Sequence, residues 1–560
     1  MRRFAVCTVT ATLILVMLGN TAFALTIQAG RARVKTVGGM HRGSWNLWSN
    51  GEYGDYVRFH AGGKYTVVAH AYGSPLGGIW PLMSLSVDGI VAETVTVKGG
   101  EARPYEFQIE TQPGVRKIAF VFQNDAADGK EDRNLYFDKI EILPVGDAAE
   151  PVPGSEREWQ DSSRKRGAEL EDKTLEQANT SIERTRKDNA SIRVVDAEDR
   201  PIEGATVVVE QRSHDFLFGC NIYMFDRFKS QQENELYKER FRDLFNYATT
   251  GFYWRGYEQE RGKPNYAYTD KVVSWCARHN VRMKGHPLLW DHNAGEPAWA
   301  GGQPEPEVQK KRVTDIISRY RGRIEFWEVV NEPSHCRAIE IDQPYRWARE
   351  VNPDAYLIVN DYYVMANGFP PFFELLEEAK RNGVPFNGIG IQAYEPRTMG
   401  FPLDRVHAIL DKYATLGKEL HITEFTPTSA GQRIIGSHVK GKWDETAQAG
   451  YAEKFYTVCF AHPSVVAVTW WDLCDAGSWL EGGGLLRKDL TPKPAYTALK
   501  KLIHEQWTTR TEGTTDETGT FSFRGFHGEY VAKVTRDEST VEQQFRLEKD
   551  DNNTVSVTVR

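Results

Sequence analysis

Trp327-Glu328-Val329-Val330-Asn331-Glu332-Pro333 is a short apolar run with a polar end, and it is one of eight such runs. Helix-like segments separate these runs between residues 216 and 505. Eight alternating strand and helix candidates predict a (β/α)8 TIM barrel. The strand candidates are Phe216–Tyr223, Phe245–Trp254, Val281–Trp290, Glu325–Val330, Ala355–Val359, Gly388–Tyr394, Glu419–Phe425 and Val465–Leu473.

Two glutamates stand at the polar ends of these runs. Glu332 closes the run quoted above, and Glu424 closes His421-Ile422-Thr423-Glu424-Phe425. The carboxyl ends of barrel strands form the active-site mouth of this fold, so we expect both carboxyl groups to face it. Glycoside hydrolysis requires one protonated and one ionised carboxyl group. Each glutamate taken singly is more typical of a surface or ion-paired residue, and only the pair indicates this chemistry.

The segments before the barrel differ in pattern from it. Residues 25–145 carry short alternating runs, such as Tyr65–Ala69 and Ile118–Phe122, between Gly, Asp and Asn clusters, which predicts a β-sandwich. Residues 146–190 open with Pro151-Val152-Pro153-Gly154 and continue with many charged residues. We expect a linker with a solvated helix there.

The two segments that flank the barrel look related to each other. Residues 191–215 contain Pro201-Ile202-Glu203-Gly204-Ala205, and residues 506–560 contain Thr518-Gly519-Thr520-Phe521 and Gly528-Glu529-Tyr530. Together they resemble the two halves of a carboxypeptidase-regulatory-like β-sandwich. We hypothesise that the barrel of residues 216–505 is inserted into this small domain, with two separate decorations as the alternative.

The N-terminus predicts export. Arg2 and Arg3 precede an apolar run, and Ala22-Phe23-Ala24 fits a small-x-small cleavage site, so residues 1–24 are expected to be a signal peptide. A membrane anchor is the alternative, but the run is short for a bilayer of about 30 Å. We therefore expect a secreted or periplasmic protein without stable membrane insertion.

Cysteine usage predicts neither a zinc site nor a dense disulfide framework. Cleavage would remove Cys7 and leave five cysteines, an odd number, without CxxC spacing. We interpret them as small buried side chains. The remaining cysteines are Cys220, Cys276, Cys336, Cys459 and Cys474.

The amino-acid composition argues against nucleic acid and for a polysaccharide as the binding partner. Of 560 residues, 40% are hydrophobic and 26% are charged, with a net charge of −8, which is ordinary globular composition without a basic excess for nucleic acid. The 15 tryptophans suit sugar-stacking surfaces as well as a core. We expect a polysaccharide partner, no nucleic acid, and a monomer.

The barrel segment resembles glycoside hydrolase family 10, the retaining endo-β-1,4-xylanases. The resemblance depends on an ordered set of short motifs rather than on any single one. They are Gly285-His286-Pro287-Leu288-Leu289-Trp290, Trp327–Pro333, Asn360-Asp361-Tyr362, Gly390-Ile391-Gln392, Ile422-Thr423-Glu424, Ser478-Trp479-Leu480 and Asp489–Tyr496.

The resemblance implies roles for individual residues and no cofactor for catalysis. Glu332 would be the general acid and then the general base, and Glu424 the nucleophile. Asn331 would bond the sugar 2-hydroxyl, a contact that strengthens in the transition state. The other implied contacts to substrate are support from Gln392, a subsite lining of His286 and Trp290, and walls of Trp471 and Trp479.

Three positions depart from the family pattern. Thr249-Thr250-Gly251-Phe252-Tyr253 replaces the usual Glu-Asn-x-x-Lys at the end of the second strand, so three polar sugar contacts are missing. Tyr394 stands where a His usually holds the nucleophile, although its hydroxyl could reach Glu424. Asp291 stands where a second His often follows the Trp. These changes leave the chemistry but put the usual xylan grip in doubt.

The N-terminal β-sandwich resembles the calcium-dependent xylan-binding modules. Phe122-Gln123-Asn124-Asp125 and Glu131–Asp138 carry the match, supported by Gly43–Trp48 and Gly54–Val57. Closely spaced carboxylate and amide oxygens suit calcium. We predict Asp125 and Asp132 as ligands, with Asn124 behind them; an Asx-rich turn without a metal is the alternative.

The function implied is a secreted retaining endo-β-1,4-glycanase, a xylanase that hydrolyses plant cell-wall xylan by double displacement. One alternative keeps this mechanism on a different or decorated β-glycan. Another is a non-catalytic carbohydrate-binding protein built on the same barrel.

Overall fold

A computed structural model describes residues 24–335 and 339–560. They form two compact units, the first ending at Ser162 and the second beginning at Ser163. Residues 1–23 of the predicted signal peptide and Cys336 lie outside the described residues. Within the described ranges, no helix combines the length and the apolar character needed to cross a bilayer.

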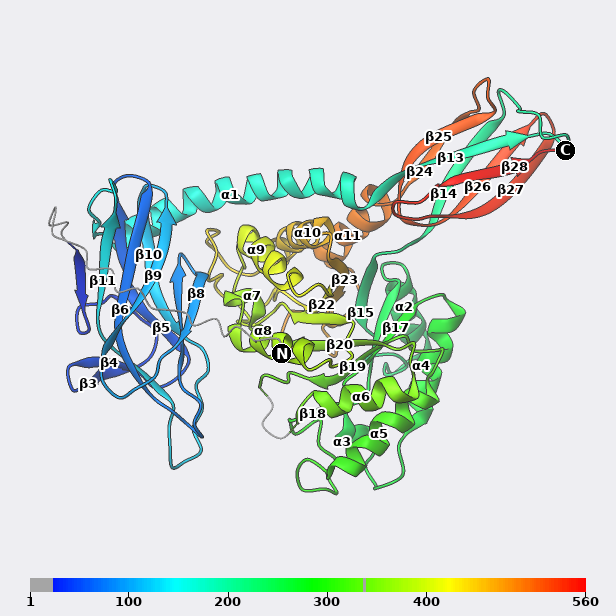
Figure 1. Ribbon diagram of the computed structural model, residues 1–560. Coiled ribbons are helices and arrows are strands. Elements are labelled where there is room, and N and C mark those ends of the chain that lie inside the picture. Colours follow the sequence, from blue (N-terminus) through cyan, green and yellow to red (C-terminus); the bar gives the residue numbers. More distant parts are fainter. Residues whose placement is uncertain (1–23, 336–338) are drawn as a thin grey trace, which may run out of the picture. The chain divides into compact units, whose positions relative to one another are not determined.

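The first unit is the predicted β-sandwich (Figure 1, blue). One sheet has the order β3-β4-β11-β6-β9 with β1 on β11, and the other has β12-β5-β10-β7-β8 with β2 on β5. Inward residues alternate along the strands, as with the buried Val67, Ala69 and Ala71 of β6. The strands are β1 (Leu25–Gln28), β2 (Val34–Lys35), β3 (Gly39–His41), β4 (Ser44–Leu47), β5 (Gly51–Phe59), β6 (Gly63–Ser74), β7 (Leu82–Val87), β8 (Ile90–Thr96), β9 (Arg103–Thr111), β10 (Gly114–Phe122), β11 (Asn134–Val145) and β12 (Val152–Pro153).

The second unit contains the predicted barrel. All neighbouring strands are parallel in the order β17-β16-β15-β23-β22-β21-β20-β19-β18, and a β17–β19 pairing closes the ring. The strands are β15 (Leu217–Asn221), β16 (Tyr247–Gly251), β17 (Arg282–His286), β18 (Leu289–Trp290), β19 (Phe326–Asn331), β20 (Tyr356–Asp361), β21 (Gly388–Gln392), β22 (Glu419–Phe425) and β23 (Val465–Trp470).

Five of the predicted strands end two to four residues earlier than expected, and the sequence explains two of these ends. The run Val281–Trp290 divides into β17 and β18 at Pro287, whose nitrogen cannot donate a ladder hydrogen bond. The run Phe245–Trp254 stops at Gly251, and Trp254 begins a short helix. Both breaks turn the chain outward at the carboxyl ends of the strands, where side chains can line a mouth.

Helices surround the barrel, and several begin with side-chain caps. Ser230 and Glu233 form a capping box at the start of α2. The helices are α2 (Gln231–Arg242), α3 (Trp254–Tyr257), α4 (Tyr266–Arg278), α5 (Pro306–Arg319), α6 (Asp342–Val351), α7 (Val364–Asn367), α8 (Pro370–Arg381), α9 (Leu403–Ala414), α10 (Glu445–Ala461), α11 (Pro494–Lys501) and the π-helix η1 (Leu502–Gln506).

The helix predicted after the first sandwich is α1 (Glu156–Thr185). It is not solvated throughout, because Thr174, Ala178 and Ile182 are buried and Ser181 donates a 2.9 Å hydrogen bond to the Ala461 carbonyl. The spacing of these three small or β-branched residues by four places them on one helical face. The second part of α1 is therefore an element of the barrel's outer layer.

The two segments that flank the barrel share sheets in a small sandwich (Figure 1, teal strands among orange and red). Strand β13 pairs with β25 and β28, and β14 pairs with β24 and β26. The barrel sequence therefore lies between strands of one small sandwich. These strands are β13 (Lys187–Val195), β14 (Thr206–His214), β24 (Arg510–Thr514), β25 (Thr520–Phe526), β26 (Gly528–Arg536), β27 (Ser539–Leu547) and β28 (Thr554–Thr558).

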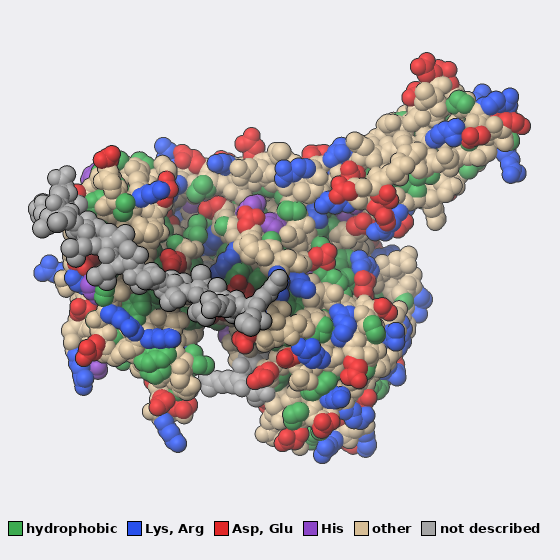
Figure 2. Space-filling view, viewed as in Figure 1, with side chains coloured by type: hydrophobic (Ala, Val, Ile, Leu, Met, Phe, Trp, Pro, Cys, Tyr) green, Lys and Arg blue, Asp and Glu red, His purple; other side chains and the backbone are tan. Residues whose placement is uncertain are grey.

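The charged side chains on the visible face are mixed in sign. Figure 2 shows Lys and Arg side chains interspersed with Asp and Glu, without one gathered basic stripe on that face. Such a pattern does not create a strong field of one sign on that face.

Candidate active site

The site lies at the carboxyl ends of the barrel strands, and close packing beneath it fixes the strand positions. His286 ends β17, Asn331 ends β19, Gln392 ends β21, and Glu424 lies near the end of β22. Gly285, beside His286, is required for space, since a Cβ there would lie 2.4 Å from the Trp327 ring. The eight-stranded ring thus brings residues more than a hundred positions apart to one mouth.

Glu332 follows β19 in a left-handed backbone conformation, with φ of 54°. Such a conformation is uncommon for a glutamate and concentrates at functional sites. Its Oε1 accepts a 2.9 Å hydrogen bond from Gln392 Nε2, and its Oε2 accepts a 3.0 Å bond from Trp290 Nε1. Burial raises the pKa of this partly exposed carboxyl group, and Asp361 raises it further, while the two donors oppose the shift. A raised pKa suits a proton donor.

Glu424 is almost fully buried, with 3% exposure. Its Oε2 accepts a 2.8 Å hydrogen bond from the Tyr394 hydroxyl, and Asn360 Nδ2 lies 3.5 Å from Oε1. Burial raises the pKa of Glu424, and the charges of Glu328 and Glu332 act in the same direction. Glu424 and Glu332 therefore interact electrostatically across the mouth and do not readily ionise together.

A buried ionic cluster lies beneath Glu424. Lys284 and His286 Nδ1 both hydrogen-bond to the carboxylate of Glu328, and all three side chains are at most 2% exposed. Burial opposes ionisation of Glu328, but Lys284 and His286 outweigh it and lower its pKa to about 2. Burial lowers the pKa of His286, which Glu328 opposes. His286 Nε2 faces Glu424 Oε1 at 4.0 Å.

Aromatic rings form the walls of the mouth. Trp471 packs edge-on against both His286 and Tyr223, with ring centroids 5.3 and 5.6 Å apart. Trp479, 51% exposed, lies 5.1 Å from the Tyr394 ring. Its backbone nitrogen donates to Asp472, which anchors the exposed ring beside the site. Flat exposed rings of this kind suit stacking against sugar faces.

The structure brings the predicted barrel residues together. Asn331 is buried, and its Oδ1 accepts a 2.9 Å bond from Asn360 Nδ2, the amide that also approaches Glu424. The Tyr394 hydroxyl reaches Glu424, as the sequence had allowed. Trp290 and Gln392 donate hydrogen bonds to Glu332, and His286 faces Glu424. Trp471 packs against His286, and Trp479 packs against Tyr394.

Lys284, Glu328 and Asn360 are part of the site but were not singled out from the sequence as site residues. A signal existed, since Lys284 and Glu328 are charged residues inside apolar strands. Lys284 stands two residues before His286, so strand alternation places both side chains on one face of β17. Glu328 lies inside β19, three residues before its last residue. Buried charges of this kind require partners.

The end of β16, which departs from the family pattern, makes aromatic rather than polar contacts. The hydroxyl oxygens of Thr249 and Thr250 are buried without a hydrogen-bond partner. Tyr253 packs against the rings of His286 and Trp290. Its hydroxyl lies 3.5 Å from that of Tyr223. The rings of Tyr223 and Tyr253 therefore lie beside the end of this strand.

Among the described residues, His286, Glu328 and Glu424 are the group whose ligand atoms could meet at a metal ion, all within 4.8 Å of one another. Glu328 already accepts hydrogen bonds from Lys284 and His286. Positive charge is thus supplied to this carboxylate from within the chain, and the arrangement suits proton chemistry by paired carboxyl groups.

A second group of acidic residues lies in the loop before β11. The Asp125 Oδ1 atom is buried without a hydrogen-bond partner, and burial and the charge of Asp132 raise the pKa of Asp125. Asn134 donates to Asp132 Oδ2 at 2.8 Å, while its own Oδ1 is buried and without a partner. Unsatisfied oxygens beside a second carboxylate fit a hard cation such as calcium. Asn134 was not predicted from the sequence.

Asn124 does not belong to this set of oxygens. Its Oδ1 accepts from the Leu82 nitrogen at 2.7 Å, and its Nδ2 donates to the Trp80 carbonyl at 3.0 Å. Asn124, the third candidate ligand, therefore has both of its side-chain polar atoms bonded to backbone groups. Its side chain instead joins the loop to β7.

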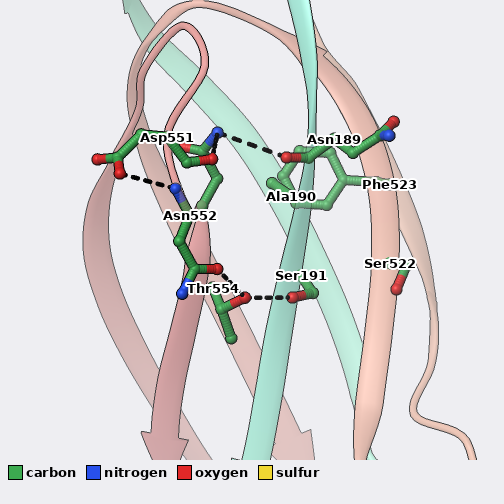
Figure 3. A pocket seen from close by; sticks show the side chains of 9 residues that line it. Asn189, Ala190, Ser191, Ser522, Phe523, Asp551, Asn552 and Thr554 are labelled. Atoms are coloured by element: carbon green, nitrogen blue, oxygen red, sulfur yellow. Dashed lines mark hydrogen bonds between the residues drawn. The ribbon is translucent and has the colours of Figure 1, made fainter.

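A shallow pocket of about 500 Å³ lies in the small sandwich (Figure 3). The Phe523 ring lies beside Ala190 there, and a Ser191–Thr554 hydrogen bond of 3.0 Å crosses one side. Asn553 donates to the Asn189 carbonyl at 3.5 Å and to two carbonyls of its own turn. The polar groups at the pocket therefore largely bond one another.

Comparison with known proteins gives two family matches. Residues 210–502, more than half of the chain, match the family described as glycosyl hydrolase family 10. Residues 66–154 match the family described as Ca-dependent carbohydrate-binding module, xylan-binding.

Individual relatives are distant in sequence. Endo-1,4-beta-xylanase 2 of Arabidopsis thaliana is 27% identical over 385 residues, 65% of this chain and 34% of that protein. Anti-sigma-I factor RsgI6 of Acetivibrio thermocellus is 28% identical over 376 residues, 64% of this chain and 46% of that protein. Endo-1,4-beta-xylanase B of Thermotoga neapolitana is 27% identical over 310 residues, 50% of this chain and 87% of that protein. The chain spans less than half the length of the first two relatives.

Proposed function

Because this chain belongs to glycosyl hydrolase family 10, we propose that it is a retaining endo-β-1,4-glycanase that hydrolyses xylan by double displacement. The observation that carries the proposal is the pair Glu332 and Glu424. They project from separate barrel strands, both have raised pKa values, and Gln392 and Tyr394 connect them.

In the first step, Glu424 attacks the anomeric carbon while the glycosidic C–O bond breaks. Glu332 transfers its proton to the departing sugar oxygen, so Glu424 becomes an ester and Glu332 becomes ionised. The partly exposed position of Glu332 suits contact with the leaving group, and the buried position of Glu424 suits a nucleophile shielded from water.

In the second step, Glu332 takes a proton from a water molecule, and the water oxygen attacks the anomeric carbon. The bond between that carbon and Glu424 breaks, Glu424 regains its carboxylate, and Glu332 is protonated again. Two inversions at one carbon retain the anomeric configuration.

Other residues of the mouth would bind and orient the sugar. We assign Asn331 to the 2-hydroxyl, because it neighbours Asn360 and the nucleophile. His286 and Trp290 line the same subsite, and Trp471 and Trp479 supply apolar walls. The tyrosines at positions 223 and 253 favour contact with sugar faces over the missing polar grip, which leaves room for a decorated xylan or another β-glycan.

We further propose that the first unit binds xylan with calcium held by Asp125 and Asp132, and with Asn134 as a third oxygen donor. The two buried, unpartnered oxygens support this assignment. Calcium, when bound, neutralises the acidic oxygens and offers coordination to sugar hydroxyls. Binding to the polymer would raise the local concentration of substrate at the barrel.

The domain division follows the same reasoning. We propose a signal peptide at residues 1–24, a binding module at 25–145, a linker with helix at 146–190, and a barrel at 216–505 inserted between the halves 191–215 and 506–560 of the small sandwich. Sheet pairing of β13 and β14 with β24–β28 supports the insertion. Secretion agrees with a polymer substrate that lies outside cells.

A non-catalytic carbohydrate-binding barrel is the second candidate, because one relative has the name of an anti-sigma-I factor and not of a xylanase. One experiment separates the two. The chain is incubated with xylan, with decorated xylans and with a panel of β-glucans, and the released reducing ends and their anomeric configuration are measured. Release of β-configured products from xylan supports the proposal, whereas binding without release from any polymer supports the non-catalytic carbohydrate-binding barrel.

A further inference from the structure

A continuous hydrogen-bonded path joins the two carboxyl groups of the site. Gln392 Nε2 donates to Glu332 Oε1 at 2.9 Å. The Tyr394 oxygen lies 2.7 Å from Gln392 Oε1 and 2.8 Å from Glu424 Oε2. Three hydrogen-bond contacts through two side chains of one strand end therefore connect residues that come from two other strands.

The middle of this path has fewer hydrogens than acceptors. A phenol carries one hydrogen, and the Tyr394 hydroxyl faces both the amide oxygen of Gln392 and the carboxylate of Glu424. Burial raises the pKa of Tyr394 well above its usual value, and the charges of Glu424 and Glu332 add to the shift, so the hydroxyl keeps its hydrogen. It can donate to only one of the two acceptors at a time.

We propose that Tyr394 is a positioning residue whose hydroxyl switches between these acceptors, donating to Glu424 in the free enzyme and to Gln392 in the glycosyl-enzyme, and thereby couples the two steps of catalysis. The inference rests on the double displacement proposed above. Only hydrogen bonds change at Tyr394 and Gln392, and neither residue forms a covalent bond.

The direction of the switch follows from acceptor strength. Double displacement requires Glu424 to be ionised in the free enzyme, and an ionised carboxylate is a stronger acceptor than an amide oxygen. Once Glu424 is an ester, its oxygens lose the negative charge and the amide oxygen of Gln392 becomes the better acceptor. The hydroxyl then turns to Gln392 by rotation about its C–O bond.

The switch changes the state of Glu332 in the sense that each step requires. A hydrogen bond to the oxygen of an amide polarises it, so the Gln392 N–H donates more strongly to Glu332. Stronger donation favours the ionised carboxylate. Glu332 is thus favoured as a base when Glu424 is esterified, and as an acid when Glu424 is free.

Other groups around Glu424 also affect its pKa, independently of the Tyr394 hydrogen bond. Glu328 and Glu332 raise its pKa, and Lys284 lowers it. His286 Nε2 lies 4.0 Å from its Oε1. The hydroxyls of Tyr223 and Tyr253 also lie near this carboxylate. None of these groups contacts both glutamates through hydrogen bonds.

Around Glu332, Asp361 raises the pKa and His335 lowers it. Trp290 donates to Oε2, the oxygen that Gln392 does not contact. Tyr362 also lies within electrostatic range of Glu332. Of these groups, only the Gln392 amide is connected through Tyr394 to Glu424, so only its hydrogen bond to Glu332 responds to a change at Glu424.

The test uses the full chain and an aryl β-xylobioside with a good leaving group. A burst of released aryl group identifies the second step as limiting kcat, while kcat/KM reports the first step. The variants are Tyr394→Phe, Gln392→Met and their combination, with Tyr363→Phe as a matched control on an exposed tyrosine. The melting temperature and circular dichroism of each variant are recorded alongside.

We expect Tyr394→Phe to slow the second step about tenfold and to move the acidic limb of kcat/KM to higher pH, because Glu424 loses a donor. Gln392→Met slows the second step by a similar factor without moving that limb. The double variant is about tenfold slower, not about a hundredfold, since both changes break one path. Azide, which attacks without a general base, restores turnover in both single variants.

Additive losses in the double variant, or an unchanged second step in Tyr394→Phe, would overturn the switch. If Tyr394→Phe does not fold, Gln392→Met with and without azide decides the question alone, because absence of rescue contradicts the coupling. A wild-type chain that releases no aryl group from any aryl glycoside instead contradicts the proposed function. The two failures are therefore distinguishable.

Discussion

The barrel and the N-terminal sandwich each bring two acidic side chains close together, but their surroundings treat the oxygens differently. In the barrel, each oxygen of Glu332 accepts a hydrogen bond, and Glu424 has the Tyr394 hydroxyl and the Asn360 amide. In the sandwich loop, Asp125 Oδ1 is buried and has no partner. Carboxyl groups surrounded by donors are arranged to exchange protons, whereas carboxyl groups left with free oxygens are arranged to receive a cation.

The largest effect expected is on activity. Glu424→Ala removes the nucleophile, and we expect xylan hydrolysis to fall by about 10⁴-fold or more with the unfolding transition preserved. Reducing-end release measures the loss. Glu377→Ala, at an exposed position on α8, is the control and should keep full activity. A Glu424→Ala variant that retains a tenth of the wild-type rate is incompatible with the nucleophile assignment.

The buried cluster beneath the barrel pair gives the next largest effect. Lys284→Met leaves Glu328 charged and buried beside His286 alone, and we expect a loss of about 3–5 kcal/mol in unfolding free energy. Urea denaturation of the second unit measures it. Lys311→Met breaks the exposed pair with Asp315 and serves as the control, where we expect less than about 1 kcal/mol. Equal effects in the two variants would show that Lys284 is not needed to compensate Glu328.

Calcium addition tests the acidic loop of the N-terminal sandwich. With calcium at about a hundred times its dissociation constant, we expect the first unit to gain about 2.7 kcal/mol relative to chelated protein. Calorimetry with calcium or EDTA measures this shift, and retention on insoluble xylan follows it. Asp125→Asn should remove the response, whereas Asp138→Asn, an exposed position on β11, should keep it. A wild-type chain that melts and binds alike in both conditions would favour a metal-free turn.

His421 is a buried side chain that, like Asp125, lacks hydrogen-bond partners. Neither of its ring nitrogens has a hydrogen-bond partner, and burial lowers its pKa to about 3. Its folded pKa is below the unfolded value, so the unfolded chain binds the proton more readily. The stability linked to His421 is therefore complete above about pH 6.5 and declines as the pH falls toward 3.

We expect the second unit to lose about 1–2 kcal/mol between pH 7 and pH 5 through this group. His421→Phe should flatten that decline in urea titrations at the two pH values. His60→Gln, at an exposed position in the other unit, should leave it unchanged. An equally steep decline in His421→Phe would assign the acid sensitivity to other residues, such as the buried His214.

The positions of the barrel strands and of the two glutamates could be predicted because they follow from the local pattern of apolar and polar residues. Apolar runs with polar ends repeat at regular spacing, and Glu332 and Glu424 close two of them. The end of β17 was less predictable, since Pro287 interrupts a run that is apolar on both sides. The packing of α1 was missed because its apolar residues are few among many charged ones.

Contacts between side chains were beyond such patterns. Lys284 and Glu328 looked like isolated charges in the sequence, and they meet only because β17 and β19 are neighbours across the closure of the barrel. The sequence motif indicated Asn124, and not Asn134, as an additional oxygen ligand. The fold commits the amide of Asn124 to backbone groups and leaves the Asn134 oxygen free.

The barrel's alternation of strands and helices, the family, and the positions of Glu332 and Glu424 at strand ends were therefore determined by the sequence alone, because periodicity and short motifs are local properties of a chain. The tertiary structure decided which carboxyl groups have donors, which lack them, and that Tyr394 faces two acceptors with one hydrogen. Those properties depend on atoms within about 3 Å that come from distant strands, and no local pattern encodes such distances.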